Sequence, residues 1–424
     1  MRDAAEGVAI MFNRRKILKG SAATAAVAVV EGIGQTALAQ DKVTKIGMIA
    51  PLSGPWARQG ELMKMGGDLA VKHINAQGGI RALGGAKLQL LSFDVGDSAE
   101  KAKNAAQRMI AQEPDLVAAS GAWLSSFTLA VSEVTERAEL PLLTLSYSDQ
   151  ITSRGFKHIF QTSPTGGTQA TVATPTLVDL AEKATGKRPT TVAIVMDNTA
   201  APVSFAKPMR EGGLEKLGLK LVVDEIFTPP LADATSIIQK VRSSRPELLI
   251  LLATNIPDDK LLLEKLNEFG LGKGRLPVIA NGAHIGAPEL LKTVGKELME
   301  GVMFIVANWP SKGQEEIVAD FKKETGEPWM TQDSLCTYGD VWIVKDALEM
   351  AGKADRRAVS EAIHKIDTRD GPAKYFPGGR VKFLENGRRD GAVFVIAQWQ
   401  DGEPITVYPP ASALKGPVWP NRSG

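Results

Sequence analysis

The sequence predicts an α/β protein of two lobes, each built on a parallel sheet. From Thr44 onward, short β-rich runs alternate with helical patterns, which is typical of parallel strands joined by crossover helices. The chain has 424 residues, of which 44% are hydrophobic, so it is long enough for two domains that each bury a core.

The N-terminus carries the pattern of an export signal. Arg14-Arg15 stands before an Ala/Val-rich run, residues 20–30, and Ala37-Leu38-Ala39 then supplies a small-residue cleavage site. A basic terminus can hold two arginines by chance, but these parts occur in the order of a twin-arginine signal. We therefore predict a signal peptide over residues 1–39 and a mature chain in the periplasm. Met11 is an alternative start, because two acids precede it where such a signal should be basic.

Charge and cysteine content narrow the possible partners of the mature chain. Removing residues 1–39 removes the formal net charge of +2, and a balanced chain is not expected to bind nucleic acid or an anionic membrane. No stretch reaches the roughly 20 uncharged residues that a membrane-spanning helix needs, so direct membrane insertion is not predicted. The single cysteine, Cys336, reads as a core residue, and none stands at the cleavage site to take a lipid. We expect a free monomer.

Short apolar runs recur at regular intervals after the signal. Each is bounded by turn or helix signals, as expected of strands buried in a parallel sheet. We predict strands at residues 45–50, 88–93, 116–119, 140–145, 192–196, 220–227, 248–253, 277–280 and 302–306.

Helical periodicity fills several of the intervals. Apolar residues recur at helical spacing in residues 61–75 and 98–111, and Gly78-Gly79 ends the first of these helices. Two further helices are predicted at residues 332–350 and 357–366. The last part, residues 380–407, instead alternates in the manner of strands around Asn386-Gly387 and Asp401-Gly402 turns, which predicts an antiparallel finish.

Three loops are the best candidates for passages between the lobes. Residues 161–167, 308–313 and 375–379 are rich in Pro, Gly, Ser or Thr. Such loops also close ordinary strand–helix units, so composition leaves that alternative open. If all three are passages, the lobes are intertwined. The predicted parts are then 41–162 plus 308–378 for the first lobe, 163–307 plus 379–410 for the second, and 411–424 for a C-terminal tail.

The sequence lacks the constellations of common catalytic sites. Its four histidines include no pair at a metal-ligand spacing, and no nucleophile elbow, phosphate-binding loop or dinucleotide-binding motif is present. The acidic pairs Asp258-Asp259 and Glu315-Glu316 fall at helix starts, where we expect them to be solvated or to cap the helix. We predict no enzyme, no cofactor and no metal, with a secreted α/β hydrolase as a remote alternative.

The loops after two predicted strands suit binding better than catalysis. In α/β proteins the binding groups follow the carboxyl ends of the strands, which here are residues 51–60 and 120–126. In the second loop, Gly121 permits close backbone approach, and Ser125 offers a hydroxyl and an amide at a helix start, a cradle for a carboxylate. The alternative is that Ser125 or Ser126 only caps the helix.

An ordered set of motifs runs along nearly all of the mature chain. Its main parts are I-G-x-x-x-P-L-S-G-P from Ile46, H-I-N-A-Q-G-G-I from His73, G-x-x-x-S from Gly121, and Tyr338-Gly339-Asp340. Their order and spacing resemble the periplasmic leucine/isoleucine/valine-binding protein family. The resemblance implies the type I periplasmic binding fold: two Rossmann-like lobes, three crossings and a ligand cleft between the lobes. It also implies a receptor that captures a small branched-chain amino acid-like, amide or aromatic carboxylate ligand and delivers it to the inner-membrane permease and ATPase of an ABC importer.

The resemblance also implies candidate ligand-binding residues. The ligand-carboxylate contact falls on Ser125 with Trp123 beside it, and a second contact falls on residues 146–148, where this chain is shorter than the family's amino-acid binders. The other candidates occupy matching loop tips. The full set is Trp56, Gln59, Trp123, Ser125, Ser146, Tyr147, Ser148, Asn198, Thr199, Thr254, Asn255, Asn281 and His284.

Two departures from the family affect the expected ligand. Amino-acid binders carry an acid in the loop that is here residues 280–285, which hold none, and a buried ammonium without a charge partner is heavily penalised. An ordinary α-amino acid is not expected unless another acid, such as Asp149, reaches the site. Residues 199–202 also lack the family's Tyr-Gly pair. Trp56, Trp123 and Trp309 could supply apolar surface instead, although each could equally belong to a core or hinge.

The main functional alternative is a sensory receptor of the same fold. Its closed form would contact a signalling partner rather than a permease. Genes for a permease and an ATPase beside the gene would indicate an importer, and genes for a kinase or regulator would indicate a sensor.

Overall fold

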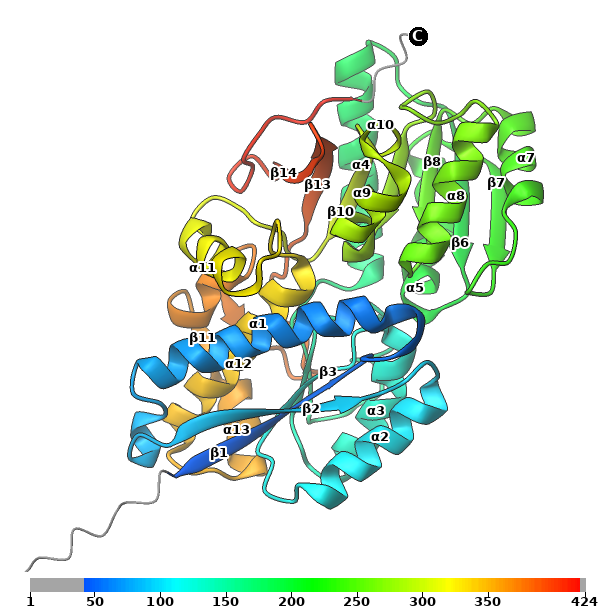
Figure 1. Cartoon of the computed structure of the whole chain (residues 1–424). Coiled ribbons are helices and arrows are strands. Elements are labelled where there is room, and N and C mark those ends of the chain that lie inside the picture. The colour runs from blue at the N-terminus through cyan, green and yellow to red at the C-terminus, as the bar shows by residue number, and fades with distance from the viewer. Residues whose placement is uncertain (1–41, 420–424) are drawn as a thin grey trace, which may run out of the picture. The chain divides into compact units, whose positions relative to one another are not determined.

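The computed structural model describes residues 42–419, which hold two large sheets with helices on both faces (Figure 1). The predicted signal peptide and residues 420–424 of the predicted tail lie outside the described residues. Within the described part, no helix is both long enough and apolar enough to cross a membrane.

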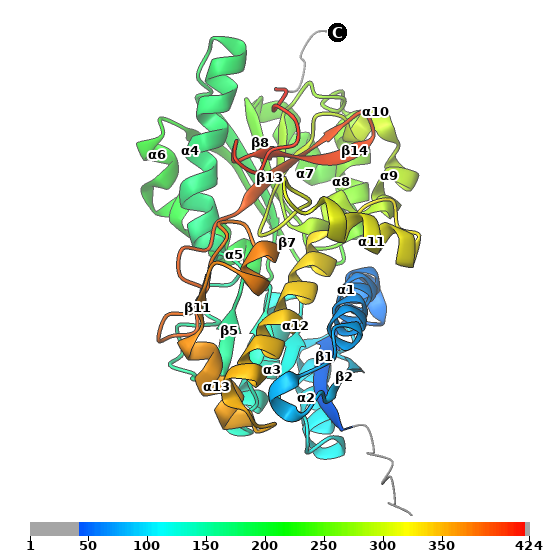
Figure 2. The same ribbon diagram turned by 90° about the vertical axis from the view of Figure 1, so that its left-hand side faces the viewer.

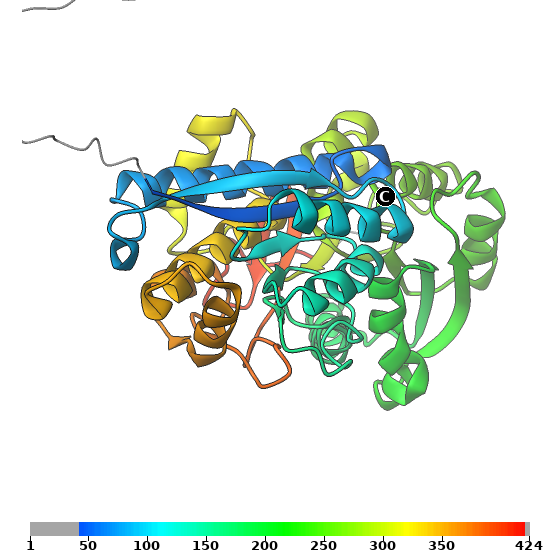
Figure 3. The ribbon, with the colours of Figure 1, turned by 90° about the horizontal axis from the view of Figure 1, so that it is seen from below.

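The first sheet has five parallel strands in the order β2-β1-β3-β4-β5. They are β1 (Val43–Ala50), β2 (Lys87–Asp94), β3 (Ala119–Gly121), β4 (Leu142–Thr144) and β5 (Ile159–Gln161). The helices around it are α1 (Ala57–Ala76), α2 (Ala99–Gln112), α3 (Ser125–Arg137), α12 (Gln332–Ala351) and α13 (Arg356–Lys365). One face packs on α1, α12 and α13, and the other packs on α2 and α3. Figure 3 shows α1 running along β1 and β2, and α12 lies beside α1 in Figure 2.

The second sheet has seven strands in the order β14-β13-β10-β9-β8-β6-β7. They are β6 (Thr191–Asp197), β7 (Lys220–Phe227), β8 (Leu248–Leu252), β9 (Val278–Asn281), β10 (Met303–Val306), β13 (Val395–Gln400) and β14 (Glu403–Tyr408). One face packs on α4 (Gly166–Thr185), α5 (Ala200–Pro208) and α6 (Leu214–Lys216). The other packs on α7 (Thr235–Ser244), α8 (Ile256–Glu268), α9 (Pro288–Val294) and α10 (Lys296–Met299). The last two strands are antiparallel, as predicted.

The chain passes between the sheets three times. It leaves the first sheet after β5 to form α4, and returns after β10 to form α11 (Glu315–Thr325) and α12. The small sheet of β11 (Asp367–Thr368) and β12 (Val381–Lys382) still packs with the first lobe. Residues 387–389 also hydrogen-bond to Gln161 of β5. The third passage therefore follows Arg389, beyond the predicted stretch 375–379, because turn composition cannot show which sheet a segment joins.

The remaining sequence predictions agree well with the elements. Every predicted strand overlaps an observed one, although 116–119 shares only Ala119 with β3, and all four predicted helices are present. Cys336 is buried in α12. Several elements were not predicted, among them β5, α4, α5, α6, α7, α9 and α10. Strand β5 is too short to give a period, and α4 contains Pro175 and many β-branched residues, which weaken a helical signal.

Candidate functional site

A cavity lies between the two sheets, beyond the carboxyl ends of β3, β4, β8 and β9. The empty space within it is about 420 Å³, which includes its open mouth. We call its two sides the first wall and the second wall. The first wall consists of Trp123, Leu124, Ser125, Leu145, Ser146 and Tyr147. The second consists of Ala201, Pro202, Thr254, Asn281, Gly282, Ala283 and His284, and Gln332 completes the lining.

Ser125 joins two loops of the first wall. Its hydroxyl oxygen accepts hydrogen bonds from the backbone N–H groups of Tyr147 and Ser148, both at 3.1 Å. The side chain does not cap α3, so the capping alternative is wrong for Ser125. A hydroxyl that accepts two hydrogen bonds still has its own proton to donate. As the first residues of α3, Ser125 and Ser126 also have backbone amides without an intrahelical acceptor. This corner of the cavity therefore offers donors to an anion.

Ser146 and Tyr147 build the floor of the same wall. The Ser146 hydroxyl donates to the carbonyl of Trp123 at 2.7 Å and also contacts the hydroxyl of Thr128 at 2.7 Å. The Tyr147 hydroxyl donates to Oε1 of Gln332 and accepts from the N–H of Ala307 at 3.2 Å. Burial raises the pKa of Tyr147, so the phenol stays protonated. Both side chains are committed to protein partners and position the wall.

Trp123 supplies the largest apolar surface of the first wall. Its φ of 67° is unusual for a bulky residue, and the hydrogen bond from Nε1 to Oδ1 of Asp333 at 2.8 Å fixes the ring. Burial raises the pKa of Asp333 to about 7, and the bond from Trp123 opposes that rise. The ring lies edge-on to His284 of the second wall, with 6.5 Å between the centroids.

His284 lies against a buried acid that the sequence did not reveal as part of the site. Its Nε2 is 3.2 Å from Oδ2 of Asp259, and the side chains are only 3% and 1% exposed. Burial lowers the pKa of His284 to about 4. Burial, with the charges of Asp258 and Asp197, raises the pKa of Asp259 well above its usual value. The contact therefore joins an imidazole that is neutral at pH 7 to a carboxyl whose ionisation burial opposes.

The expectation that Asp258 and Asp259 are solvated is therefore wrong. Asp258 is also buried, and its carboxylate accepts hydrogen bonds from the backbone of Leu231 at 2.7 Å and the side chain of Asn255 at 2.6 Å. The first turn of α8 packs under the 3-10 helix Ala283–Gly286, which removes both acids from water. Glu315 and Glu316 are exposed at the start of α11, as expected.

The candidate residues divide into two groups. Trp123, Ser125, Ser146, Tyr147, Thr254, Asn281 and His284 line the cavity. Ser148, Asn198, Thr199 and Asn255 are not in its lining, and their side chains bond within nearby elements. Thr199, for example, donates to Oδ1 of Asp197 at 2.6 Å, and Asn255 caps α8 by accepting from the N–H of Asp258 at 2.9 Å. A loop-tip position therefore did not suffice to direct a side chain into the cavity.

The sequence suggested that Trp56, Gln59 and Trp309 lie at the ligand site, but none of the three lines the cavity. Trp56 lies outside the lining but connects the lobes, because its Nε1 donates to the carbonyl of Thr254 at 3.1 Å. Gln59 is fully buried in α1, and neither atom of its amide has a hydrogen-bond partner among the described residues. Trp309 is a core residue beside Phe304 and does not line the cavity.

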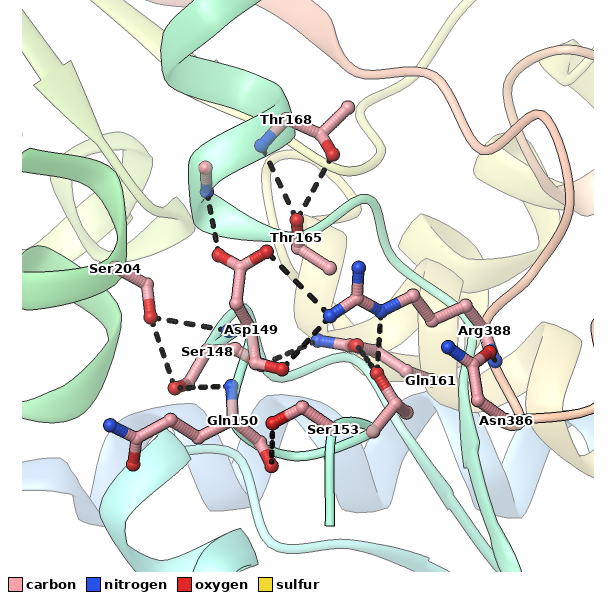
Figure 4. A network of polar contacts seen from close by, with 12 residues as sticks. Ser148, Asp149, Gln150, Ser153, Gln161, Thr165, Thr168, Ser204, Asn386 and Arg388 are labelled. Carbon is pink, nitrogen blue, oxygen red and sulfur yellow. Dashed lines mark hydrogen bonds and ion pairs between the residues drawn. The ribbon is translucent and has the colours of Figure 1, made fainter. Parts of the chain in front are cut away.

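Asp149 does not supply the missing acid. Figure 4 shows its carboxylate turned toward the start of α4, where Oδ2 accepts from the N–H of Gly167 at 2.9 Å. Arg388 lies on its other side, with Nη2 3.7 Å from Oδ1 and 2.9 Å from the backbone carbonyl of Asp149. The backbone N–H of Asp149 donates to the hydroxyl of Ser204 in α5 at 3.1 Å. Asp149 is absent from the cavity lining and ties the lobes together instead.

Sequence reasoning missed several lining residues. Leu124, Leu145, Ala201, Pro202, Gly282 and Ala283 contribute small or apolar surface, and Gln332 contributes an amide. Gln332 was predicted only as the start of a helix. Its place at a helix start was the only feature of the sequence that could have indicated a role in the site, because helix starts commonly face a binding site in α/β proteins.

Two strand–helix lobes, joined by three passages around a cavity, define a type I periplasmic binding protein. The chain belongs to the periplasmic binding protein family, whose family model matches residues 43–404. This confirms both the resemblance and the α/β two-lobe fold. Membership of the family implies a periplasmic or extracellular location.

Individual relatives agree with this assignment. The Leu/Ile/Val-binding protein homolog 7 of Brucella melitensis is 28% identical over 380 residues, which are 87% of this chain and 92% of that protein. A branched-chain amino acid transporter substrate-binding protein from Streptococcus pneumoniae, in complex with isoleucine, has a TM-score of 0.73 at 18% identity, covering 86% of this chain and 100% of that one. An ABC transporter solute-binding protein from R. palustris, in complex with benzoate, has a TM-score of 0.73 at 15% identity, covering 89% and 98%. These proteins are binding proteins, which confirms the prediction that the chain is not an enzyme.

Proposed function

We propose that the protein is the periplasmic receptor of an ABC importer, which captures a small carboxylate between its lobes and delivers it to an inner-membrane permease coupled to an ATPase. The observation that carries the proposal is the corner of the cavity at Ser125, where a hydroxyl proton and the first amides of α3 are available to an anion.

Contacts between the lobes support capture by closure. Trp56 donates to Thr254, the hydroxyls of Ser148 and Ser204 lie 3.0 Å apart, and the N–H of Ala200 donates to Ser126 at 3.3 Å. All of these contacts would break if the lobes separated. A ligand that touches both walls only in the closed form would shift the population toward that form, which a permease could recognise.

The wall composition favours a ligand that does not need an ammonium group. Among the described residues no acid lines the cavity, and burial raises the pKa of both acids that lie directly behind it, Asp259 at His284 and Asp333 at Trp123. Leu145, Pro202 and Trp123 provide apolar surface. We therefore propose an aromatic or branched aliphatic acid, or an amide, as the ligand. Isoleucine and benzoate in the two structural relatives show that this fold accommodates both chemistries.

Competition calorimetry tests the ligand class. Benzoates, branched aliphatic acids and their amides should bind more tightly than leucine, isoleucine and valine, because only the amino acids bring a buried ammonium without a partner. If any of these amino acids binds ten or more times more tightly than every acid and amide, the ligand class is wrong and another residue balances the charge.

We further propose that the precursor is exported by the twin-arginine route and acts as a monomer. Replacing Arg14 and Arg15 together by lysine should retain the precursor, with its signal attached, in the cytoplasm. Normal maturation of this double variant would rule out that route.

A further inference from the structure

The amide nitrogen of Gln332 has no acceptor among the described residues. The backbone N–H of Ala307 is 2.7 Å from Oε1 of Gln332, and a backbone N–H can only donate, so the side-chain oxygen must face Ala307. The Tyr147 hydroxyl donates to the same oxygen. These two bonds fix the orientation of the amide and turn Nε2 away from Ala307. The residue is 2% exposed and lines the cavity, and its Nε2 is not one of the fully enclosed unpaired atoms, so its N–H groups are donors open to the cavity.

The side chain of Tyr147 spans the distance between the Gln332 amide and the corner of the cavity at Ser125. Its backbone N–H binds the hydroxyl of Ser125, while its phenol oxygen binds Gln332. The two polar ends of the cavity therefore lie one tyrosine side chain apart. An aromatic ring with a carboxylate at one end and an oxygen at the para position has nearly that length, and it could lie alongside the ring of Tyr147.

The cavity that holds the two polar ends also has apolar surface. Trp123 has its only polar side-chain atom engaged by Asp333, and Leu145 and Pro202 have none. A ring in this space would lose no hydrogen bonds at its faces. A buried N–H that stays unpaired is costly, so a ligand without an acceptor at the far end would be disfavoured at Gln332.

We propose that Gln332 is a specificity-determining residue that donates a hydrogen bond from Nε2 to a para oxygen on an aromatic carboxylate. This inference rests on the proposed function, because the carboxylate must occupy the corner at Ser125. It adds a second polar contact for the ligand at the start of α12, besides the one at the start of α3.

A matched pair of ligands tests the inference on the unmodified protein. 4-Methoxybenzoate and 4-ethylbenzoate have nearly the same shape, and only the first has an oxygen at the para position. By calorimetry the methoxy compound should bind about tenfold more tightly. The variant Gln332→Glu keeps an oxygen that can accept from Ala307 and Tyr147. It replaces the Nε2 donor with a second oxygen, which can only accept. This variant should lose or reverse the preference.

The outcomes separate the inference from the proposed function. Equal binding of the two compounds, an unchanged preference in Gln332→Glu, or binding of aliphatic acids alone would overturn the role of Gln332 and leave the carboxylate receptor intact. If no aromatic or aliphatic carboxylate binds, both the inference and the proposed carboxylate ligand are wrong. Thermal unfolding of Gln332→Glu without ligand checks that the variant is folded.

Discussion

The first wall of the cavity satisfies its polar side chains with hydrogen bonds to neighbouring loops, whereas the second wall has three acids buried behind it. Ser125 and Ser146 each bond to backbone groups of their own lobe. Behind the second wall, Asp197, Asp258 and Asp259 are at least nine-tenths buried, and burial raises the pKa of each. A buried acid also lies behind the first wall, but Asp333 accepts a hydrogen bond from Trp123, whereas neither carboxyl oxygen of Asp259 has a hydrogen-bond partner among the described residues. The second wall is therefore the one under electrostatic strain, which a pH change can reveal.

The largest expected effect concerns the loop that carries the first wall. A Cβ at Gly121 would lie 1.9 Å from the carbonyl oxygen of Ile49, and its φ is +154°. Gly121→Ala should therefore reduce the free energy of unfolding by about 3 kcal/mol or more, measured in urea. Gly282→Ala is the matched change in the second wall. Its φ is also positive, at +118°, but its Cβ would meet a side chain, His284 at 2.5 Å, rather than backbone, so the loss should be smaller. Equal losses would mean that the first loop is no more rigid than the second.

Ser125→Ala tests whether the first wall holds the carboxylate. Loss of the donor should weaken binding of benzoate or another bound acid by roughly 1–3 kcal/mol in calorimetry. Ser126→Ala is the reference variant, because Ser126 does not line the cavity and its hydroxyl accepts from Ala200 of the other lobe, so it measures the loss of one contact between the lobes without the loss of a ligand contact. If Ser125→Ala leaves the affinity unchanged, Ser125 serves only to join the two loops.

Asp259→Asn tests the strain behind the second wall. Because the folded-state pKa of Asp259 is raised, the folded protein holds a proton that the unfolded chain releases above about pH 4, so stability falls as pH rises toward the folded-state value. The amide cannot ionise. The variant should be more stable than the parent by about 1 kcal/mol at pH 8, with no advantage near pH 4.

Asp258→Asn is the control for that experiment, because its carboxylate already accepts two hydrogen bonds. Burial raises the pKa of Asp258 as well, but the amide nitrogen of Asn cannot accept one of these bonds, which offsets the gain, so this variant should not be more stable than the parent at pH 8. A pH-independent difference between Asp259→Asn and the parent would show that Asp259 is not the strained group.

The smallest effect is expected at Asp149, which links the two lobes outside the cavity. Asp149→Asn should cost about 1 kcal/mol or less of stability, since the side chain accepts from Gly167 at the start of α4. The affinities of the variant for carboxylates and for leucine should stay within twofold of those of the parent. A twofold change is about 0.4 kcal/mol, which is the smallest difference that calorimetry resolves. A selective loss of leucine binding would mean that Asp149 reaches the ligand after all.

The sequence alone determined the local parts of this protein. Periods of two and 3.6 residues follow from which face of a strand or helix is buried, so strands such as β7 and helices such as α2 were predictable from their own residues. The loops after β3 and β4, with Ser125 and Tyr147, followed from the rule that parallel strands direct their carboxyl ends to one edge.

Only the tertiary structure decided which of those parts meet. Gln332 bonds to a tyrosine 185 positions earlier, and His284 faces an acid of α8 that its sequence context presented as solvated. The third passage follows Arg389 because residues 387–389 pair with β5, a strand too short to predict. Such contacts depend on how whole elements pack. The hydrophobic pattern of one segment fixes which face is buried but does not specify the partner that covers it.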